Sequence, residues 1–371
     1  MEEFRLSASP ILVLVGILLV WSVPPLCPAQ NVQDGIEHVV VTGGKAIWRV
    51  FPSGTVEPVV ICTQGIPFSV ISPTGHCVYG TGGLRTGRGI FENKQRAGLE
   101  NLAISFHLGT DVPEYWDQAC FSADASQVAL RCRIGRDDNI FILTLGAFRP
   151  LTRFTGAVIT QLSWSPDGRA LAFYCDPTGR ADPDFYRGPF ELWTVDLAGN
   201  ARKLANAGDV DVLSGARSIR PVWSPDGQRV YFSSRPDRAS KQVWCYVSTP
   251  GTGQDPEPLG HGVPSSISPD GRFIYVTSLE QQPSPHGPRV RPYRLSLGTR
   301  EVTELQPTMR WPKSSLSGTR IVSCSFGTTV LLFADAAGLV TRTIDLVEKT
   351  EPLGIQDWDA RVHWVRPGES K

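Results

Sequence analysis

The sequence predicts an all-β chain that folds as a seven-bladed β-propeller, closed by pairing of its N- and C-terminal strands. A Ser-Pro-Asp-Gly phrase occurs at Ser165–Gly168, Ser224–Gly227 and Ser268–Gly271. Runs rich in valine, isoleucine and aromatic residues flank each copy, and the two chain ends carry complementary parts of the same unit. Recurrence every ~40–60 residues indicates a repeat architecture.

Each phrase is typical of a strand, a tight turn and a second strand. Proline fixes φ at the first central position, aspartate bonds the backbone ahead of it, and glycine adopts the conformation that closes the turn. The runs after the turn, such as Val230–Phe232, are typical of strands. A third strand such as Phe190–Val195 or Gln242–Val247 and a short fourth such as Arg202–Leu204 complete the expected unit.

Diverged copies of the turn extend the repeat toward both ends of the sequence. They occur at Ser72–Gly75, Ser122–Ala125 and Ser315–Gly318. Near the C-terminus, His363–Gly368 matches a first strand and its turn, and no further strand follows. The sequence therefore predicts a last unit that lacks its second, third and fourth strands.

The N-terminal segment supplies the complementary set. His38–Thr42, Ala46–Phe51 and Val56–Val60 fit a second, third and fourth strand. We expect the two ends to build one blade, because a closed ring leaves no free sheet edges. Six blades is the alternative if the copy near Ser315 or the shared blade is misread, and an open solenoid is the structural alternative.

Composition and the first residues bear on the compartment. The 371 residues include 36 basic and 36 acidic ones, a balance that favours neither nucleic acid nor a membrane surface as partner. The apolar run Ile11–Val23, followed by Cys27-Pro28-Ala29, indicates a secretory signal at residues 1–29. We expect residues 30–371 to form one propeller domain in the periplasm or outside the cell. A retained membrane anchor is the alternative.

The cysteines are expected to be buried free thiols. Eight are present, and seven remain after cleavage at Ala29, an odd number for a disulfide framework. Cys132 and Cys175 occupy the same repeat position, where later copies have Ser234 and Ser278. That position favours a small side chain, and buried cysteine behaves as a small apolar residue. A disulfide framework is the alternative.

The repeats carry a family resemblance. With Trp164 and Trp223 before the turn and Phe173 and Tyr231 after it, they resemble the TolB-type propeller repeat, strongly over ~160–280 and more weakly on either side. The resemblance implies a propeller with an extracytoplasmic home. TolB binds partner proteins around the mouth of its six-bladed propeller and carries a separate N-terminal α/β domain, for which this sequence leaves no room.

Signals for catalysis are sparse. The sequence has no Gly-x-Ser-x-Gly elbow and no Cys-x-x-Cys pair, and its six histidines are not at ligand spacing. We expect no catalytic residue and no bound metal. Asp182 and Asp184 in one connection, with Asp209 and Asp211 in the next, carry the oxygens that calcium prefers, so a calcium site is an alternative. A propeller enzyme, a carbohydrate lyase or hydrolase with an axial metal, is the alternative function.

The long connections are predicted to share one face, because strands in a blade alternate in direction. Second-to-third loops are expected at Leu84–Gly98, Asp176–Pro189, Arg235–Lys241 and Gln281–Pro292, and connections between blades at Thr110–Gln118 and Ala205–Ile219. Loops on a rigid scaffold tend to carry function, so this face is expected to bind a protein partner. The candidate binding residues are Arg85, Arg88, Phe91, Arg96, Asp182, Asp184, Tyr186, Asp209 and Asp211. Trp164, Trp193, Trp223 and Trp244 are expected to pack in the core or between blades.

Overall fold

The computed structural model describes most of the repeat region of the chain. The described residues are 37–43, 46–61, 68–71, 77–80, 90–93, 102–105, 115–144, 147–181, 188–208, 220–235, 242–280, 289–324, 330–346 and 361–366. Gly35–Lys371 forms one compact unit, and the predicted signal at residues 1–29 lies outside the described residues. Within these ranges no helix has the length and apolar character needed to cross a membrane.

The described strands form seven four-stranded antiparallel sheets, six of which use consecutive strands. The first sheet contains β4 (Phe68–Ile71), β5 (Cys77–Gly80), β6 (Ile90–Asn93) and β7 (Leu102–Ser105). The second contains β8 (Tyr115–Phe121), β9 (Val128–Ile134), β10 (Asp137–Thr144) and β11 (Ala147–Pro150). The third contains β12 (Val158–Trp164), β13 (Ala170–Asp176), β14 (Phe190–Asp196) and β15 (Ala201–Gly208).

The next three sheets repeat this order. The fourth contains β16 (Val222–Trp223), β17 (Val230–Ser234), β18 (Trp244–Ser248) and β19 (Glu257–His261). The fifth contains β20 (Val263–Ile267), β21 (Phe273–Glu280), β22 (Arg289–Ser296) and β23 (Val302–Glu304). The sixth contains β24 (Arg310–Ser314), β25 (Arg320–Cys324), β26 (Val330–Asp335) and β27 (Val340–Asp345).

The remaining sheet joins the two ends of the chain. This closing sheet contains β28 (Arg361–Val365), β1 (His38–Gly43), β2 (Ala46–Val50) and β3 (Val56–Ile61). β28 is antiparallel to β1, with Val40 opposite His363. The predicted all-β propeller and its closure by the chain ends are confirmed. The sheet around Ser315 and the shared sheet, on which the alternative of six depended, are both present among the described strands.

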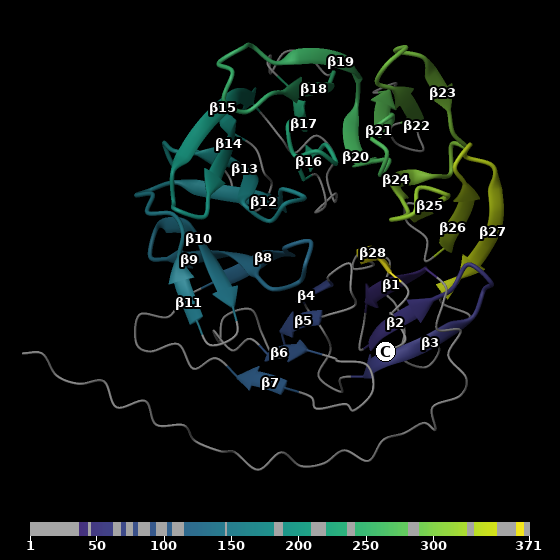
Figure 1. Cartoon of the computed structure of the whole chain (residues 1–371), viewed down its shortest axis with the longest axis horizontal. Coiled ribbons are helices and arrows are strands. Elements are labelled where there is room, and N and C mark those ends of the chain that lie inside the picture. Colours follow the sequence, from purple (N-terminus) through teal and green to yellow (C-terminus); the bar gives the residue numbers. More distant parts are fainter. Residues whose placement is uncertain are drawn as a thin grey trace, which may run out of the picture. The chain divides into compact units, whose positions relative to one another are not determined.

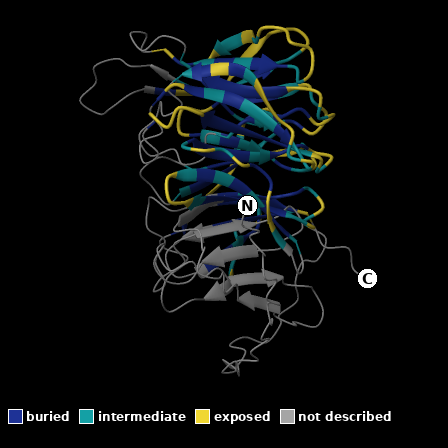
Figure 2. Ribbon diagram, turned by 90° about the vertical axis from the view of Figure 1, so that its left-hand side faces the viewer, coloured by how far each residue is buried: buried dark blue, intermediate teal, exposed yellow. Residues whose placement is uncertain are grey.

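The sheets of this unit follow one another around a ring, with the first strand of each nearest the centre and the fourth at the rim (Figure 1). Apolar side chains fill the space between neighbouring sheets. The cluster of Ile140, Ile159 and Phe173 joins the second sheet to the third, and the cluster around Phe333 and Trp364 joins the sixth to the closing sheet. Figure 2 shows these buried segments in dark blue and the turns at the edges in yellow.

The Ser-Pro-Asp-Gly turns form one edge of the ring, called the turn edge here. The Ser165 hydroxyl donates to Asp167 at 2.6 Å and accepts from the backbone N–H of Ala170 at 2.9 Å. The turns at Ser122, Ser224 and Ser268 repeat both bonds. Successive turns also pack together, since a methyl group at Gly227 would lie 3.8 Å from Pro166 of the preceding sheet. The opposite edge is the loop edge.

Tryptophan side chains join neighbouring sheets, as predicted for Trp164 and Trp223. The indole N–H of Trp164 donates to the carbonyl of Cys120 at 2.9 Å, and that of Trp223 to Ser163 at 3.1 Å. Trp364 repeats the bond to Lys313 at 3.0 Å. Trp193 and Trp244 are half-buried on third strands.

The thiol prediction is confirmed for the five cysteines whose side chains are described. Cys120, Cys132, Cys175 and Cys245 are buried, Cys324 is half-buried, and all are free. Burial raises the pKa of Cys120 and Cys324 to about 12, so neither is a thiolate at neutral pH.

Candidate functional site

The loop edge differs from its predicted form in the first sheet. The predicted loop Leu84–Gly98 is interrupted by β6, in which Phe91 pairs with Val78 and Ile104. In chain order, residues 81–89 come between β5 and β6, whereas residues 94–101 come between β6 and β7. Phe91 thus lies in β6, and Arg96 lies outside the described residues.

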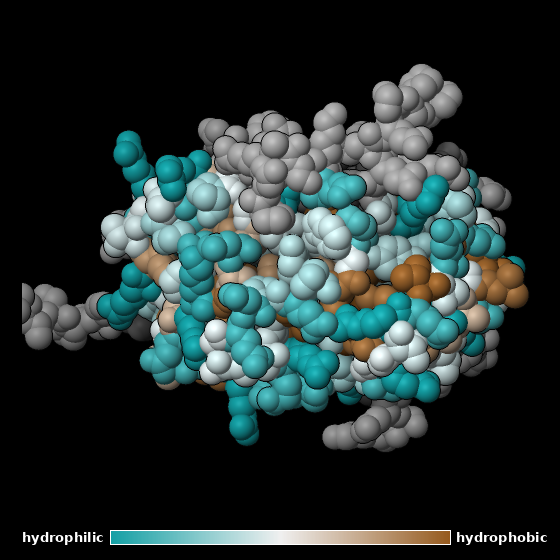
Figure 3. Space-filling view, turned by 90° about the horizontal axis from the view of Figure 1, so that it is seen from above, coloured by the Kyte–Doolittle hydropathy of each residue, from teal (hydrophilic) through white to brown (hydrophobic). Residues whose placement is uncertain are grey.

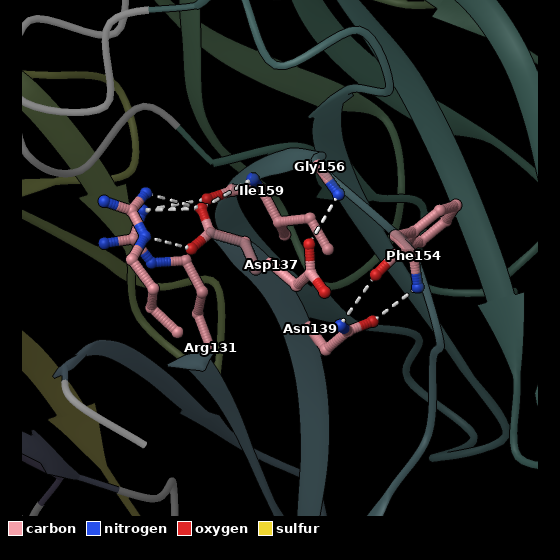
Figure 4. A network of polar contacts seen from close by, with 8 residues as sticks. Arg131, Asp137, Asn139, Phe154, Gly156 and Ile159 are labelled. Carbon is pink, nitrogen blue, oxygen red and sulfur yellow. Dashed lines mark hydrogen bonds and ion pairs between the residues drawn. The ribbon is translucent and has the colours of Figure 1, made fainter. Parts of the chain in front are cut away.

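A buried ionic network holds the loop edge of the second and third sheets together (Figure 4). Arg133 makes a bidentate pair with Asp138, at 2.7 and 3.0 Å, and the Asp138 carboxylate has no exposure to solvent. Asp138 also accepts from the backbone N–H of Ile159 at 3.1 Å, while Arg131 donates to the Ile159 carbonyl at 2.9 Å. Both polar groups of Ile159, at the start of β12, are thereby fixed by the second sheet.

Neighbouring side chains on β10 fix the connection between these two sheets. Asp137 accepts from the backbone N–H of Gly156 at 2.6 Å. Asn139 accepts from the N–H of Phe154 at 2.7 Å and donates to its carbonyl at 3.0 Å. These bonds, drawn in Figure 4, satisfy both backbone polar groups of Phe154 and the N–H of Gly156 without regular structure.

One buried carboxylate organises the base of the Asp176–Pro189 loop. Asp176 is fully buried and accepts from the N–H and hydroxyl of Thr178 and from the N–H groups of Arg180 and Ala181, at 2.6–2.9 Å. At the other end, a methyl group at Gly188 would lie 2.6 Å from the Cα of Ala181. The loop therefore leaves and re-enters the sheet at one point, and its stem is closed.

The thiol beside this base is not a nucleophile. Burial raises the pKa of Cys175 to about 12, and the negative charges of Glu191, Asp176 and Asp138 add to the shift. Nucleophilic cysteines require a lowered pKa and some exposure, and Cys175 has neither.

The stems of three unlike connections meet on the third and fourth sheets. Phe190 at the end of one loop pairs with Gly208 at the end of β15. Gly208 in turn forms a bridge to Arg235, which follows β17 and donates its N–H to the carbonyl of Ala207 at 2.9 Å. Residues 182–187, 209–219 and 236–241 thus continue from a hydrogen-bonded base, which we call the stem platform.

In sequence, the predicted binding residues follow the stems of this platform or belong to the stretch that contains the first sheet. Asp182, Asp184 and Tyr186 continue from its first stem, and Asp209 and Asp211 continue from its second. These five residues, together with Arg85, Arg88 and Arg96, lie outside the described residues, and Phe91 is described only by its backbone in β6. Both the placement of the two acidic segments on neighbouring stems and their chemistry stay predictions.

The described residues offer no metal site, since none of their His, Cys, Asp and Glu side chains form a group of three or more able to hold an ion. Sequence reasoning missed the network of Arg131, Arg133 and Asp138. Its signal is Arg131 and Arg133 before the two-residue turn at Gly135 and the dipeptide Asp137-Asp138 after it, because antiparallel pairing across this turn places Arg133 opposite Asp138.

The rim is mostly polar. Figure 3 shows teal side chains over most of this view, with brown ones in a band across the middle and right. Among the described residues, the large apolar side chains with high exposure are Ile134, Val302 and Leu339, at 42%, 59% and 65%. Scattered apolar residues of this kind are ordinary on protein surfaces and define no site by themselves.

Comparison with known proteins identifies the fold. No protein-family model matches the sequence, and no curated protein is similar to it in sequence. Among solved structures, TolB from Acinetobacter baumannii has a TM-score of 0.50 at 16% identity, over 89% of this chain and 66% of TolB. The fold is that of a TolB-type β-propeller. The chain thus spans about two thirds of the length of that TolB, and the predicted resemblance is confirmed at the level of fold.

Other solved propellers are equally similar. A periplasmic gluconolactonase from Pseudomonas aeruginosa has a TM-score of 0.52 at 13% identity, over 90% of this chain and 99% of its own. A functionally unknown protein from Desulfotomaculum acetoxidans has a TM-score of 0.55 at 10% identity, over 90% and 100%. Since TolB and a gluconolactonase are both similar to this chain in fold, function has to be argued from the site.

Proposed function

We propose that this chain is an extracytoplasmic, non-enzymatic propeller that binds a protein partner through its loop edge. The observation that carries the proposal is the stem platform, in which three unlike connections continue from stems bonded to each other. The buried network of Arg131, Arg133 and Asp138 holds the adjoining connection in place. A rigid base limits the entropy lost when the residues it carries bind a partner.

The two edges differ in the way that this role requires. The described turns of the turn edge repeat one geometry and pack on one another, which leaves little room for specificity. The loop edge instead carries connections of unlike length and sequence, including the acidic segment Asp182–Asp184 and the acidic segment Asp209–Asp211. Variable loops on a fixed scaffold are a common source of binding specificity.

The test compares two matched variants as bait for proteins from the native host. In one, residues 182–187 and 209–219 are replaced by short Gly-Ser connections; in the other, Arg169 and Gln228 at the turn edge become alanine. The proposal predicts that a defined set of proteins, crosslinked to the unaltered chain in cells, is lost only from the first variant, with both variants melting near the unaltered chain. Equal capture by both variants would contradict it.

The proposed compartment has its own test. A signal at residues 1–29 and the likeness to a periplasmic gluconolactonase support export. N-terminal sequencing of protein from the periplasm or medium is expected to begin near Gln30. Protein that stays in the cytosol with Met1 intact would exclude export, and full-length protein in the membrane fraction would favour the anchor.

A second candidate is a propeller enzyme acting on a sugar lactone, favoured by the gluconolactonase among similar structures. Purified chain would be assayed for glucono-δ-lactone opening with and without divalent cations. Rates above the uncatalysed reaction that are lost in the loop-replaced variant would support this candidate, whereas rates equal to the uncatalysed reaction would exclude this substrate.

A further inference from the structure

The turn of the sixth sheet lacks a carboxylate that its counterparts carry. Ser317 stands where the other turns have Asp167, Asp226 and Asp270. In those turns the aspartate accepts from the turn serine and from the backbone N–H two residues further on. In the sixth sheet the Ser315 hydroxyl instead shares a bond of 3.1 Å with the Ser317 hydroxyl.

A carboxylate reaches this turn from the other end of the chain. Glu37, which directly precedes β1, accepts from the backbone N–H groups of Leu316 and Ser317 and, at 2.6 Å, from the Ser317 hydroxyl. Glu37 and Leu316 are 279 positions apart in the sequence. Hydrogen bonds to a charged acceptor are among the stronger ones in proteins.

The contact lies on the seam where the ring closes. Along the same seam, Lys313 donates to the carbonyl of Val362 at 2.8 Å, and Trp364 donates to the carbonyl of Lys313 at 3.0 Å. Near the β2–β3 turn, a methyl group at Gly54 would lie 3.6 Å from the Arg342 guanidinium. The bonds of Lys313 and Trp364 attach β28 to the sixth sheet, and the Arg342 side chain lies close to the turn after β2. Glu37 attaches the start of β1.

We propose that Glu37 is a clasp that brings a carboxylate to this turn from the N-terminal side, with its own set of donors, and so holds β1 in the closed ring. The strand pairing of β1 with β28 has no covalent connection, so its first residues are free to fray unless they are tied down. Glu37 lies eight positions after Ala29, the predicted cleavage point. Closure of the ring would therefore depend on a residue near the start of the mature chain.

The clasp is tested by a double-mutant cycle read by amide hydrogen exchange. Glu37→Ala removes three charge-assisted hydrogen bonds, two of them exposed to solvent, and is expected to speed exchange in β1 and β28 about tenfold while β16–β19 stay unchanged. Ser317→Asp restores a carboxylate to the turn but no contact to β1, so in the Glu37→Ala background it is expected to leave exchange in β1 and β28 at the fast rate. With Glu37 present, Ser317→Asp brings two carboxylates together and is expected to speed exchange.

Two further variants keep the test decisive. Glu37→Gln keeps the shape and removes the charge, and is expected to fall between Glu37 and Glu37→Ala. Asp226→Asn, in the turn of the fourth sheet, is the matched control and is expected to speed exchange in β16 and β17 alone. Unchanged exchange in β1 and β28 after Glu37→Ala, or effects of Glu37→Ala and Ser317→Asp that simply add, would overturn the proposal.

Discussion

At the scale of single residues, the fold depends on carboxylates that organise backbone. Asp167 and Asp270 fix turns, Asp176 fixes the base of a loop, and Asp138 fixes the start of the next sheet. Each accepts N–H groups that strands leave unpaired where they end, and a buried N–H without a partner is costly. Aspartates that accept backbone N–H groups therefore organise both edges of the ring. Only at the turn edge do they occupy the same position in successive sheets.

Acid is expected to destabilise the ring through the turn aspartates. The bond from Ser268 and others lower the pKa of Asp270 to about 2, and serine bonds also lower the pKa of Asp124, Asp167 and Asp226. An unfolded aspartate has a pKa of about 3.9. The stabilisation that the ionised turn aspartates give the folded state is therefore complete above that pH and is lost as the pH falls toward about 2.

The measurement is the urea midpoint between pH 5 and pH 2. Exposure of these side chains to solvent weakens each contribution, so the loss is the sum of several small ones. Asp270→Asn is expected to show a smaller fall over this range than the unaltered chain. A midpoint that stays constant over the range would show that these bonds do not stabilise the fold.

Removal of the Asp138 charge is expected to lower the free energy of unfolding far more than loss of one turn aspartate does. Asp138→Asn leaves the fully buried Arg131 without its balancing charge, and loss of one partner of a buried pair costs about 3–5 kcal/mol. Asp137→Asn is the control, since this half-buried residue makes one bond to Gly156 and its loss is expected to cost about 1 kcal/mol. Urea unfolding of the two variants distinguishes them, and equal losses would show that burial of the pair has no consequence.

At the scale of elements, the repeat predicted most strands because local chemistry and sheet position agree there. The turn phrase places a first strand before it and a second after it, as β12 with β13 and β20 with β21 show. The prediction failed where the strand has no local signal. β6 has four residues in a stretch rich in glycine and arginine, and its place is decided by pairing with β5 and β7.

Two other features were not predicted, for related reasons: the end of β15 and the stem platform. β15 was expected to end at Leu204 and continues to Gly208, because bulges restore its pairing with β14. The stem platform was not predicted, because the bridge from Gly208 to Arg235 depends on the distance between two sheets, which no local pattern records. The placement of the acidic segments beside it follows from strand order and stays a prediction, because these residues lie outside the described ranges.

The tryptophan bonds between sheets are expected to matter more than those within a sheet. Trp223→Phe removes the indole N–H that donates to the carbonyl of half-buried Ser163 and is expected to cost about 2 kcal/mol, because this carbonyl then loses that bond. Trp193→Phe is the control, because its indole N–H donates to Glu191 on the same strand and is half-buried. Urea unfolding compares them, and a larger loss for Trp193→Phe would contradict this ranking.

At the scale of the whole molecule, closure places the two ends of the closing sheet at the edge of the ring opposite the loop edge. Both ends of the closing sheet, Glu37 and Arg366, leave it at the turn edge, where the clasp lies. The connections of the stem platform leave at the opposite edge. The proposed clasp and the proposed binding surface are therefore independent, and a variant of one is expected to leave the other intact.

Closure itself is tested most directly by a cysteine pair across the seam. Val40 and His363 are opposite each other in β1 and β28, so Val40→Cys with His363→Cys is expected to form an intramolecular disulfide that raises the urea midpoint. The buried thiols Cys120 and Cys175 have raised pKa values and are expected not to compete. Val40→Cys with Val222→Cys, in the fourth sheet, should stay reduced. No crosslink in the first pair, or crosslinks only between molecules, would contradict a ring closed by the two ends of the chain.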